Sequence, residues 1–237
     1  RRTLRVVLGG RPYFLKLHLG VGWGEILKNL ITLRLPVIGA RNEYQACEYL
    51  ASKGIAAPHV AAFAQRGWSP ADQTSFVICD ALEERQSLED LSLNWHEQPP
   101  DPQDLRSLTL AVADFAKAMH GAGVIHRDFY ICHLLMPLAA SAQDPQLAVI
   151  DLHRAKLFTT IPKRWLERDL AAMLFSVMDL PVSRFAWLRF LRRYRGKRLP
   201  EIFAEEGDFW RAVYQRAVAL YRKSERKGLT AGRFQPE

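Results

Sequence analysis

Two aspartates, each directly after a short apolar run, are the residues of this chain best suited to chemistry. Asp128 stands in VIHRDFYICHLL at 124–135, and Asp151 stands in LAVIDLHRA at 147–155. Phosphoryl transfer to a hydroxyl needs one carboxylate that accepts the proton of the hydroxyl and another that holds the magnesium ion bridging the transferred phosphate. The two loops therefore predict a phosphotransferase with Asp128 as the general base and Asp151 as the metal ligand.

An upstream lysine and an acidic helix extend this pattern toward that of protein kinases, whose catalytic loop carries the triplet His-Arg-Asp. Lys16 interrupts the apolar run YFLKL. It is predicted to clamp the phosphates of a nucleotide, with a role in catalysis and in cofactor binding; the alternative is simple alternation, with the lysine facing solvent. Glu43, in the first turn of the following helix, is its expected ion-pair partner, and Glu48 is the competitor.

His133 departs from the usual kinase pattern. It stands five residues after Asp128, where protein kinases place the asparagine that holds a second magnesium ion. Imidazole is a poor ligand for magnesium, which prefers oxygen. By its position His133 is assigned to the cofactor and metal site together with Asp151. Because imidazole binds magnesium poorly, the alternative is that His133 hydrogen-bonds a phosphate or Asp151.

Glycines are also placed differently from the kinase pattern. His153 stands where a glycine usually follows the metal-binding aspartate, so a flexible activation loop is not implied. The cluster Gly20, Gly22 and Gly24 follows Lys16 instead of preceding it, and we interpret it as a lid or acceptor loop.

Several neighbours of the two aspartates are interpreted as structural. Asp169, within WLERDLAAMLFS, is expected to be a buried anchor for the catalytic loop. His126 is expected to point inward, and Arg127 to stabilise its loop. His126, Cys132 and His133 could suggest zinc, but a structural zinc site needs four ligands at recognisable spacing, and the sequence offers no second cluster.

Hydrophobic patterning predicts strands and one helix first, then mainly helices. Strands are expected at 4–8, 13–17 and 76–79, with Gly9-Gly10 as a hairpin turn, and helices at 41–53, 104–120, 165–179, 184–195 and 208–227. The predicted fold is α+β and protein-kinase-like: a small β-rich N-terminal lobe, residues 1–82, that clamps the nucleotide, and a larger, mainly helical lobe, 83–237, for catalysis and acceptor binding. Asp80 and Leu82, in a candidate hinge, are assigned to nucleotide binding.

The formal charge of +8 indicates an acidic partner. Residues 189–198, RFLRRYRGKR, carry six basic side chains and no acid, and RKSERK at 222–227 adds more. Anionic lipid, a phosphorylated glycan or an acidic protein would suit them, and so would a merely solvated helix face. Nucleic acid is not expected, because no nucleic-acid-binding module is recognisable.

Cellular location is indicated by what the sequence lacks. No apolar stretch reaches the ~18 residues of a membrane span, and the first residues lack a signal-peptide core. Three scattered cysteines are typical of a reducing compartment, hence the cytosol. Because the chain begins inside a strand-like run, we expect further residues upstream.

Five stretches of the chain resemble the lipopolysaccharide core heptose kinase family: YFLKLHLGVGWGEILKNL, LPVIGARNEYQA, GVIHRDFYICHLL, LAVIDLHRAKL and PKRWLERDLAAMLFS. The likeness runs from about residue 4 to residue 225. It implies ATP-dependent phosphorylation of a heptose hydroxyl on the inner core of lipopolysaccharide, with magnesium, at the cytoplasmic face of the inner membrane. By the same resemblance Asp128 is the base, Asp151 the metal ligand, Lys16 the phosphate clamp and Glu43 its partner.

Two other functions remain open at this point. One is a kinase of the same fold with another acceptor, such as a protein tyrosine or a small aminated sugar. The other is a pseudokinase that only binds. Loss of Lys16, Asp128 or Asp151 would mark a pseudokinase, and all three are present.

Overall fold

The computed structural model describes residues 2–19, 39–68, 73–141 and 143–226. It contains two compact units: one is Arg1–Glu83 together with Asp151–Lys156, and the other is Glu84–Ile150 together with Leu157–Glu237. The boundaries predicted from the sequence assigned residues 151–156 to the C-terminal lobe. In the structure this segment groups with the first unit by its contacts. The roles assigned to the two lobes remain predictions. The glycine cluster at 20–24 lies outside the described residues.

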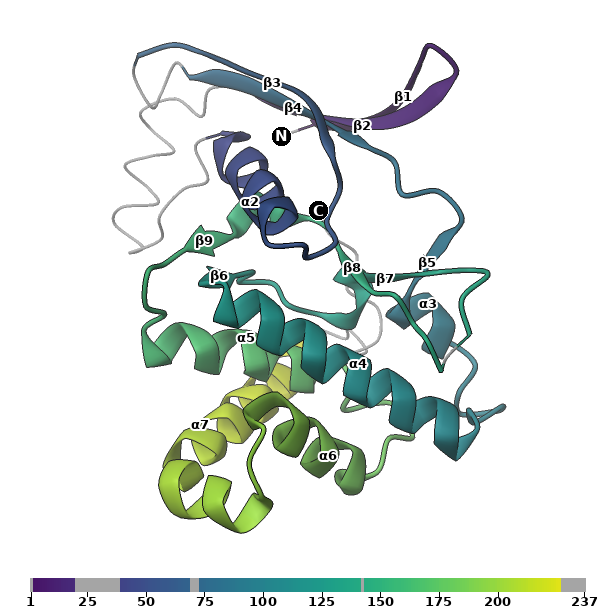
Figure 1. Cartoon of the computed structure of the whole chain (residues 1–237), viewed down its shortest axis with the longest axis vertical. Helices are drawn as coiled ribbons and strands as arrows, with labels where there is room; N and C mark the ends of the chain where they lie inside the picture. The colour runs from purple at the N-terminus through teal and green to yellow at the C-terminus, as the bar shows by residue number, and fades with distance from the viewer. Residues whose placement is uncertain (1, 20–38, 69–72, 142, 227–237) are drawn as a thin grey trace. The chain divides into compact units, whose positions relative to one another are not determined.

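The first unit is built on an antiparallel sheet (Figure 1). Its strands, β1 (Arg2–Leu8), β2 (Arg11–His18), β3 (Val60–Arg66) and β4 (Thr74–Asp80), lie in the order β1-β2-β4-β3. Gly9 and Gly10 have φ values of 56° and 78°, so the predicted hairpin is confirmed, with both turn residues in the left-handed region that glycine accepts. The alanine-rich β3 was not predicted, because alanine is depleted in strands.

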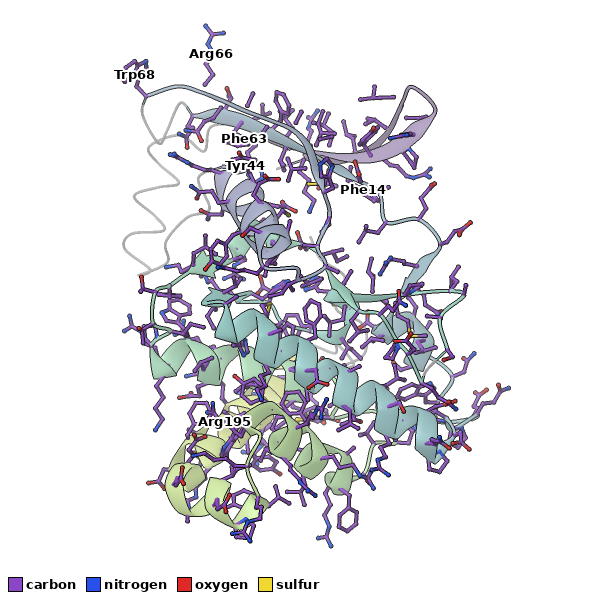
Figure 2. The ribbon with its side chains drawn as sticks, in the orientation of Figure 1. Phe14, Tyr44, Phe63, Arg66, Trp68 and Arg195 are labelled. Carbon is purple, nitrogen blue, oxygen red and sulfur yellow. The ribbon has the colours of Figure 1, made fainter. Side chains whose placement is uncertain are left out.

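Helix α2 (Arg41–Ser52) confirms the helix predicted at 41–53, and it packs on one face of this sheet (Figure 1). The core between them contains Val77 and Cys79 of β4, and Tyr44 of α2 stacks on Phe63 of β3 with ring centroids 4.5 Å apart (Figure 2). The start of α2 is fixed to β4 because the backbone N–H of Ala40 donates to Oγ of Ser75, at 2.9 Å.

Two cysteine thiols meet in this core. Cys47 of α2 and Cys79 of β4 are both buried and unoxidised. The hydrogen bond with Cys79 and the burial of the thiol both raise the pKa of Cys47 far above its ordinary value. Cys47 is therefore a thiol, and behaves as an apolar core residue.

The second unit is mainly helical (Figure 1). Its helices are α3 (Leu88–Ser92), α4 (Pro102–Gly121), α5 (Lys163–Phe175), α6 (Arg184–Arg195) and α7 (Leu199–Glu225). Helix α4 packs on α6, and α5 packs on α7. Together with the sheet unit, this confirms the predicted α+β fold class, with a small β-rich N-terminal lobe and a larger, mainly helical C-terminal lobe.

Short strands and 3-10 turns flank the loops that contain Asp128 and Asp151. They are β5 (Arg85–Ser87), β6 (Val124–Ile125), the 3-10 turn η1 (Ile131–His133), β7 (Leu134–Pro137), β8 (Ala148–Val149), the 3-10 turn η2 (Leu152–Arg154) and β9 (Lys156–Leu157). Strands β5, β7 and β8 form an antiparallel sheet in that order. Within the described part of the chain, no helix is both long and apolar enough to cross a membrane.

Helix ends account for most differences from the sequence-based expectations. Helix α4 begins at Pro102, before Asp104, because the Asp101 side chain accepts from the N–H of Gln103 at 2.7 Å and caps it. Helix α5 ends at Phe175, short of 179. Helix α7 begins at Leu199 instead of 208, with non-helical backbone at Glu206. This kink, next to Gly207, interrupts the apolar pattern from which the start was predicted.

Gly123 is held where a side chain does not fit. Its φ is 83°, a Cβ there would collide with the carbonyl oxygen of Phe158, and its own carbonyl accepts from the N–H of Phe158 at 2.8 Å. We expect Gly123→Ala to lower the free energy of unfolding by about 2–4 kcal/mol, from backbone strain plus the clash.

Gly121→Ala is the matched control, because Gly121 ends α4 and an added Cβ would meet open space. It should leave stability unchanged or raise it by up to about 1 kcal/mol. Urea unfolding of both variants measures this, and equal stability for the two would contradict the role given to Gly123.

Candidate active site

Lys16 faces α2 and not solvent. On β2 it lies opposite the fully buried Val77 of β4, and directly paired residues of antiparallel strands point to the same face. Its Nζ forms an ion pair with Oε1 of Glu43 and lies 3.4 Å from Oδ1 of Asp151. Glu48 is exposed. The expected pairing with Glu43, in preference to Glu48, is therefore present, and the functional roles of both residues remain predictions.

The burial of Glu43 explains why it pairs with Lys16. The Glu43 side chain is almost completely buried, and its Oε2 has no hydrogen-bond partner among the described residues. A buried carboxylate without a countercharge would be strongly destabilising. Lys16 supplies that charge, and the pair fixes the ammonium group between α2 and Asp151.

Asp151 is held in an unusual backbone conformation. It follows β8 with φ 59° and ψ 52°, in the left-handed region, and leads into η2. Nδ1 of His153 lies 2.9 Å from its Oδ1, so the residue in place of the kinase glycine contacts the carboxylate directly. This contact of His153 was not predicted from the sequence, where the residue stood out only for replacing the usual glycine.

The donors near Asp151 fit a nucleotide-bound magnesium ion better than a dedicated metal cage. Magnesium at such sites takes one or two carboxylates and completes its shell with phosphate oxygens and water. Asp151 offers such a carboxylate. Among the residues that the structure describes, there is no group of three or more His, Cys, Asp or Glu suited to a metal ion.

The loop after β6 is held by Asp169 of α5. Its two carboxylate oxygens accept from the backbone N–H of His126, at 2.7 Å, and of Arg127, at 2.8 Å. Asp169 is fully buried, which confirms the predicted anchor. Arg127 has φ 75°, a conformation that a non-glycine residue keeps only when its surroundings enforce it. The two hydrogen bonds to Asp169 supply that constraint at the residue before Asp128.

His126 points inward, as predicted, and its neighbours fix its tautomer. Its Nε2 lies 2.9 Å from the carbonyl oxygen of Ile150 and donates to it, while its Nδ1 accepts from the N–H of Asp128 at 3.3 Å. Burial lowers the pKa of His126 below its ordinary value, and the neighbouring His133 lowers it further. His126 is therefore neutral and braces the backbone of Asp128.

His133 also contacts the loop that contains Asp128. Its Nδ1 donates to the carbonyl oxygen of Asp128 at 2.7 Å, and its ring stacks on that of His126. Ser176, directly after α5, also holds the loop, since its Oγ accepts from the N–H of Ile131 at 3.2 Å. Ligation of a metal by His133 remains a prediction, and it would have to use Nε2.

Asp80 and Leu82, assigned from sequence to nucleotide binding, lie where β4 ends. The N–H of Asp80 donates to the carbonyl of His59, and that of Ala81 to the carbonyl of Pro12, at 2.9 and 3.1 Å. Leu82 is half-buried. This backbone is thus tied to the sheet, and the assignment of these residues to a cofactor is still a prediction.

Several residues that contact the loop of Asp128 or its anchor were not predicted from the sequence. Arg127 lies over the Trp165 ring, 5.4 Å from its centroid. His120, at the end of α4, lies 3.5 Å from Oδ2 of Asp169. No local pattern marks such contacts, because they join residues dozens of positions apart.

A basic groove of about 840 Å³ lies between α4, α6 and the start of α7. Its acidic residues are Asp114 and Glu201, and its basic residues are Arg106, Lys117, Arg189, Arg192, Arg193, Lys197 and Arg198. Four of these, Arg106, Lys117, Arg189 and Arg192, are exposed and form no ion pair within the described part of the chain.

The other basic residues of 189–198 are engaged internally. Arg193 pairs with Asp114 at 2.6 Å, Arg195 with Glu206 at 2.7 Å, Lys197 with Glu205 at 2.5 Å and Arg198 with Glu201 at 2.7 Å. Arg195 also lies over the rings of Tyr194, Phe209 and Trp210, among the helices of the second unit (Figure 2). The stretch is therefore partly structural and only partly available to a partner.

Comparison with known proteins identifies close relatives. Residues 1–194 match the model of the "Lipopolysaccharide kinase (Kdo/WaaP) family". The chain is 46% identical over 230 residues to the lipopolysaccharide core heptose(I) kinase WaaP of Pseudomonas aeruginosa, covering 96% of this chain and 86% of that protein. It is 39% identical over 231 residues to the Escherichia coli protein of the same name, covering 97% and 87%.

A solved structure described as "WaaP in complex with acyl carrier protein" has the same fold. Its TM-score is 0.80 at 41% sequence identity, over 93% of this chain and 85% of that one.

The neutral, buried state of His126 makes stability depend on pH. Because its folded pKa lies below the ordinary value of 6.5, its contribution is complete above that pH and is lost as pH falls and the unfolded chain takes up the proton. We expect the free energy of unfolding to fall below pH 6.5, by at most about 1.4 kcal/mol per pH unit from this one group.

His126→Gln removes the titration and keeps a donor for Ile150, so urea unfolding between pH 5 and pH 7.5 should show a shallower slope than in the wild type. His59→Gln, at an exposed position, is the comparison variant and measures how much of the slope comes from an imidazole that is not buried. Equal slopes for the wild type and His126→Gln would exclude His126 as the source.

Proposed function

The chain belongs to the lipopolysaccharide kinase (Kdo/WaaP) family, and we propose that it transfers the terminal phosphate of ATP to a hydroxyl of a heptose in the lipopolysaccharide inner core. The observation that carries this proposal is the 46% identity to a heptose(I) kinase over 96% of the chain. This range includes every residue assigned to chemistry. The reaction is that of a kinase with an alcohol group as acceptor.

The proposed chemistry divides between the two units. In the second, Asp128 accepts the proton of the attacking heptose hydroxyl, and the hydrogen bonds around His126, His133 and Asp169 keep its loop in one conformation. In the first, Lys16 binds the phosphates of the nucleotide, and Glu43 keeps its ammonium group in place. Lys16 already interacts with two carboxylates, so it is held before any nucleotide arrives.

Asp151 is the proposed ligand of the magnesium ion that accompanies ATP. The ion supplies charge neutralisation for the transferred phosphate. His153 contacts Asp151 Oδ1. We infer that this contact orients the carboxylate, a function that second-sphere partners of metal ligands commonly have.

The two alternatives weighed from sequence are less well supported. A pseudokinase has no need for the Lys16–Glu43 pair or for the hydrogen bonds that hold the loop of Asp128. An acceptor other than the lipopolysaccharide core is disfavoured by the names of the relatives at 46% and 39% identity.

Substitution of the two aspartates tests the function. Asp128→Asn should lower kcat for phosphorylation of dephosphorylated inner-core lipopolysaccharide by about 10²–10⁴-fold, with little change in nucleotide affinity. Asp151→Ala should weaken binding of magnesium and an ATP analogue as well as turnover. Radiolabel transfer and calorimetric titration measure the two effects.

Asp208→Asn, at an exposed position on α7, is the control and should behave as the wild type. Wild-type turnover in Asp128→Asn would remove this residue from the mechanism. Unchanged metal dependence in Asp151→Ala would remove Asp151 as the ligand.

We also propose that the basic groove docks an acidic protein, an acyl carrier protein in particular. Four exposed basic residues face solvent there and form no ion pair with any residue that the structure describes. The helices that line the groove, α4 and α6, also line an apolar cavity of about 270 Å³ with Leu105, Leu108, Val112, Ala186, Trp187 and Phe190. An acylated acidic protein would match both features, and the related structure contains an acyl carrier protein.

We further propose that the enzyme works at the cytoplasmic face of the inner membrane, where its lipid-linked acceptor would be made. The proposal rests on the nature of the acceptor named for the relatives. Anionic lipid would attract the same exposed basic residues, at about 1 kcal/mol per charge near the surface.

A charge-matched pair of variants tests the groove. In one, Arg106, Arg189 and Arg192 become Gln; in the other, Arg211, Arg222 and Lys223 of α7 become Gln, for the same change in net charge. We expect the first to raise the Kd for acyl carrier protein at least about tenfold at low salt, and the second to change it little. ATP affinity should be unchanged in both.

Calorimetry with acyl carrier protein and co-sedimentation with anionic vesicles are the measurements. Equal weakening by both variants would show that net charge alone is responsible. Loss of vesicle binding in the first variant, with normal binding of the carrier protein, would identify lipid as the ligand of the groove and contradict the proposal.

A further inference from the structure

A line of buried polar contacts runs from α6 to the anchor of the catalytic loop. The Tyr194 hydroxyl of α6 lies 2.8 Å from Nδ1 of His120 at the end of α4. Nε2 of His120 lies 3.5 Å from Oδ2 of Asp169 in α5; it forms no hydrogen bond with the described residues, so this contact is electrostatic. All three side chains are buried. Three helices therefore meet at one polar cluster, next to the backbone of His126 and Arg127.

The hydrogen-bond direction along this line follows from Asp169. Its carboxylate accepts from two backbone N–H groups and has no hydrogen to donate, so the tautomer of His120 with hydrogen on Nε2 is the one that suits this neighbour. In that tautomer Nδ1 accepts a hydrogen bond from the Tyr194 hydroxyl. Burial raises the pKa of Tyr194 above its ordinary range, so the hydroxyl keeps the hydrogen that it donates.

His120 also contacts the loop directly. Its ring meets that of Phe129 edge-on, with centroids 5.9 Å apart, and Phe129 follows Asp128 in the sequence. The Tyr194 ring is held separately, stacked on Phe190 and edge-on to Trp210. Removal of the hydroxyl alone would therefore leave the aromatic packing of α6 in place.

We propose that Tyr194 and His120 are positioning residues for the catalytic loop and act through Asp169. The Tyr194 hydroxyl orients the His120 ring, the ring orients the Asp169 carboxylate, and the carboxylate fixes the amides of His126 and Arg127. The consequence for Asp128 rests on the proposed kinase function. The effect on the two amides does not.

Tyr194→Phe tests the first contact without creating a cavity. A neutral hydrogen bond contributes about 0.5–1.5 kcal/mol, which corresponds to a roughly 2- to 12-fold change in a local opening equilibrium. We expect hydrogen exchange of the 126–127 amides to accelerate by that factor. The kcat for heptose phosphorylation should fall by about 3- to 10-fold, with the KM for ATP unchanged. Tyr214→Phe, at an exposed site on α7, is the control.

Two substitutions of His120 test the second contact. His120→Gln can keep an N–H near the position of Nε2, whereas His120→Leu cannot. We expect His120→Leu to lower kcat by roughly 10- to 100-fold, because small misplacement of a catalytic group is costly. His120→Gln should recover a large part of this loss and of the protection of the 126–127 amides.

Three results would overturn the proposal. One is exchange at 126–127 in Tyr194→Phe equal to that in Tyr214→Phe. Another is a uniform rise in exchange across the helices with a lowered Tm, which would make the contacts merely structural. The third is equal activity and exchange in His120→Gln and His120→Leu. If the wild type proves inactive on heptose, the proposed function fails, and the exchange measurements still decide the positioning role.

Discussion

One buried carboxylate constrains the loop that carries Asp128. Asp169 has no exposed surface; two backbone amides donate to its carboxylate, and His120 lies beside it. A buried charge of this kind tolerates little rearrangement, since loss of a partner leaves it unsolvated. The loop that carries Asp128 is therefore fixed through its main chain.

The first unit also contains a buried carboxylate, and an ion pair balances its charge. Glu43 is buried on α2 and needs a positive charge, and Lys16 on β2 provides it. Each partner comes from a different element, so the pair also links the helix to the sheet. Lys16 is therefore both the countercharge of Glu43 and the group proposed to bind phosphate. A substitution there disturbs both roles at once, which makes Glu43 the more informative position for separating them.

The sequence was most informative where chemistry restricts the choice of residue. The loops of Asp128 and Asp151, the lysine on its strand, the Gly9-Gly10 hairpin and Asp169 all follow from local patterns. Helix ends were less predictable, since a cap at Asp101 or a kink at Glu206 depends on one residue's geometry. Strand β3 was missed because its alanines carry a weak strand signal. Contacts such as Tyr194–His120, or the internal pairing of Arg193 and Arg195, depend on which helices pack together, and no local pattern encodes that.

The two neighbouring thiols in the core of the first unit have a practical consequence. A thiol must ionise to react with an alkylating reagent, and Cys47 is both buried and strongly disfavoured as a thiolate. It can be modified only while α2 is separated from the sheet. Cys132, which is less buried, provides an internal reference for the reagent. The rate at which Cys47 is alkylated thus measures how often α2 separates from the sheet. Helix α2 also carries Glu43, the glutamate paired with Lys16.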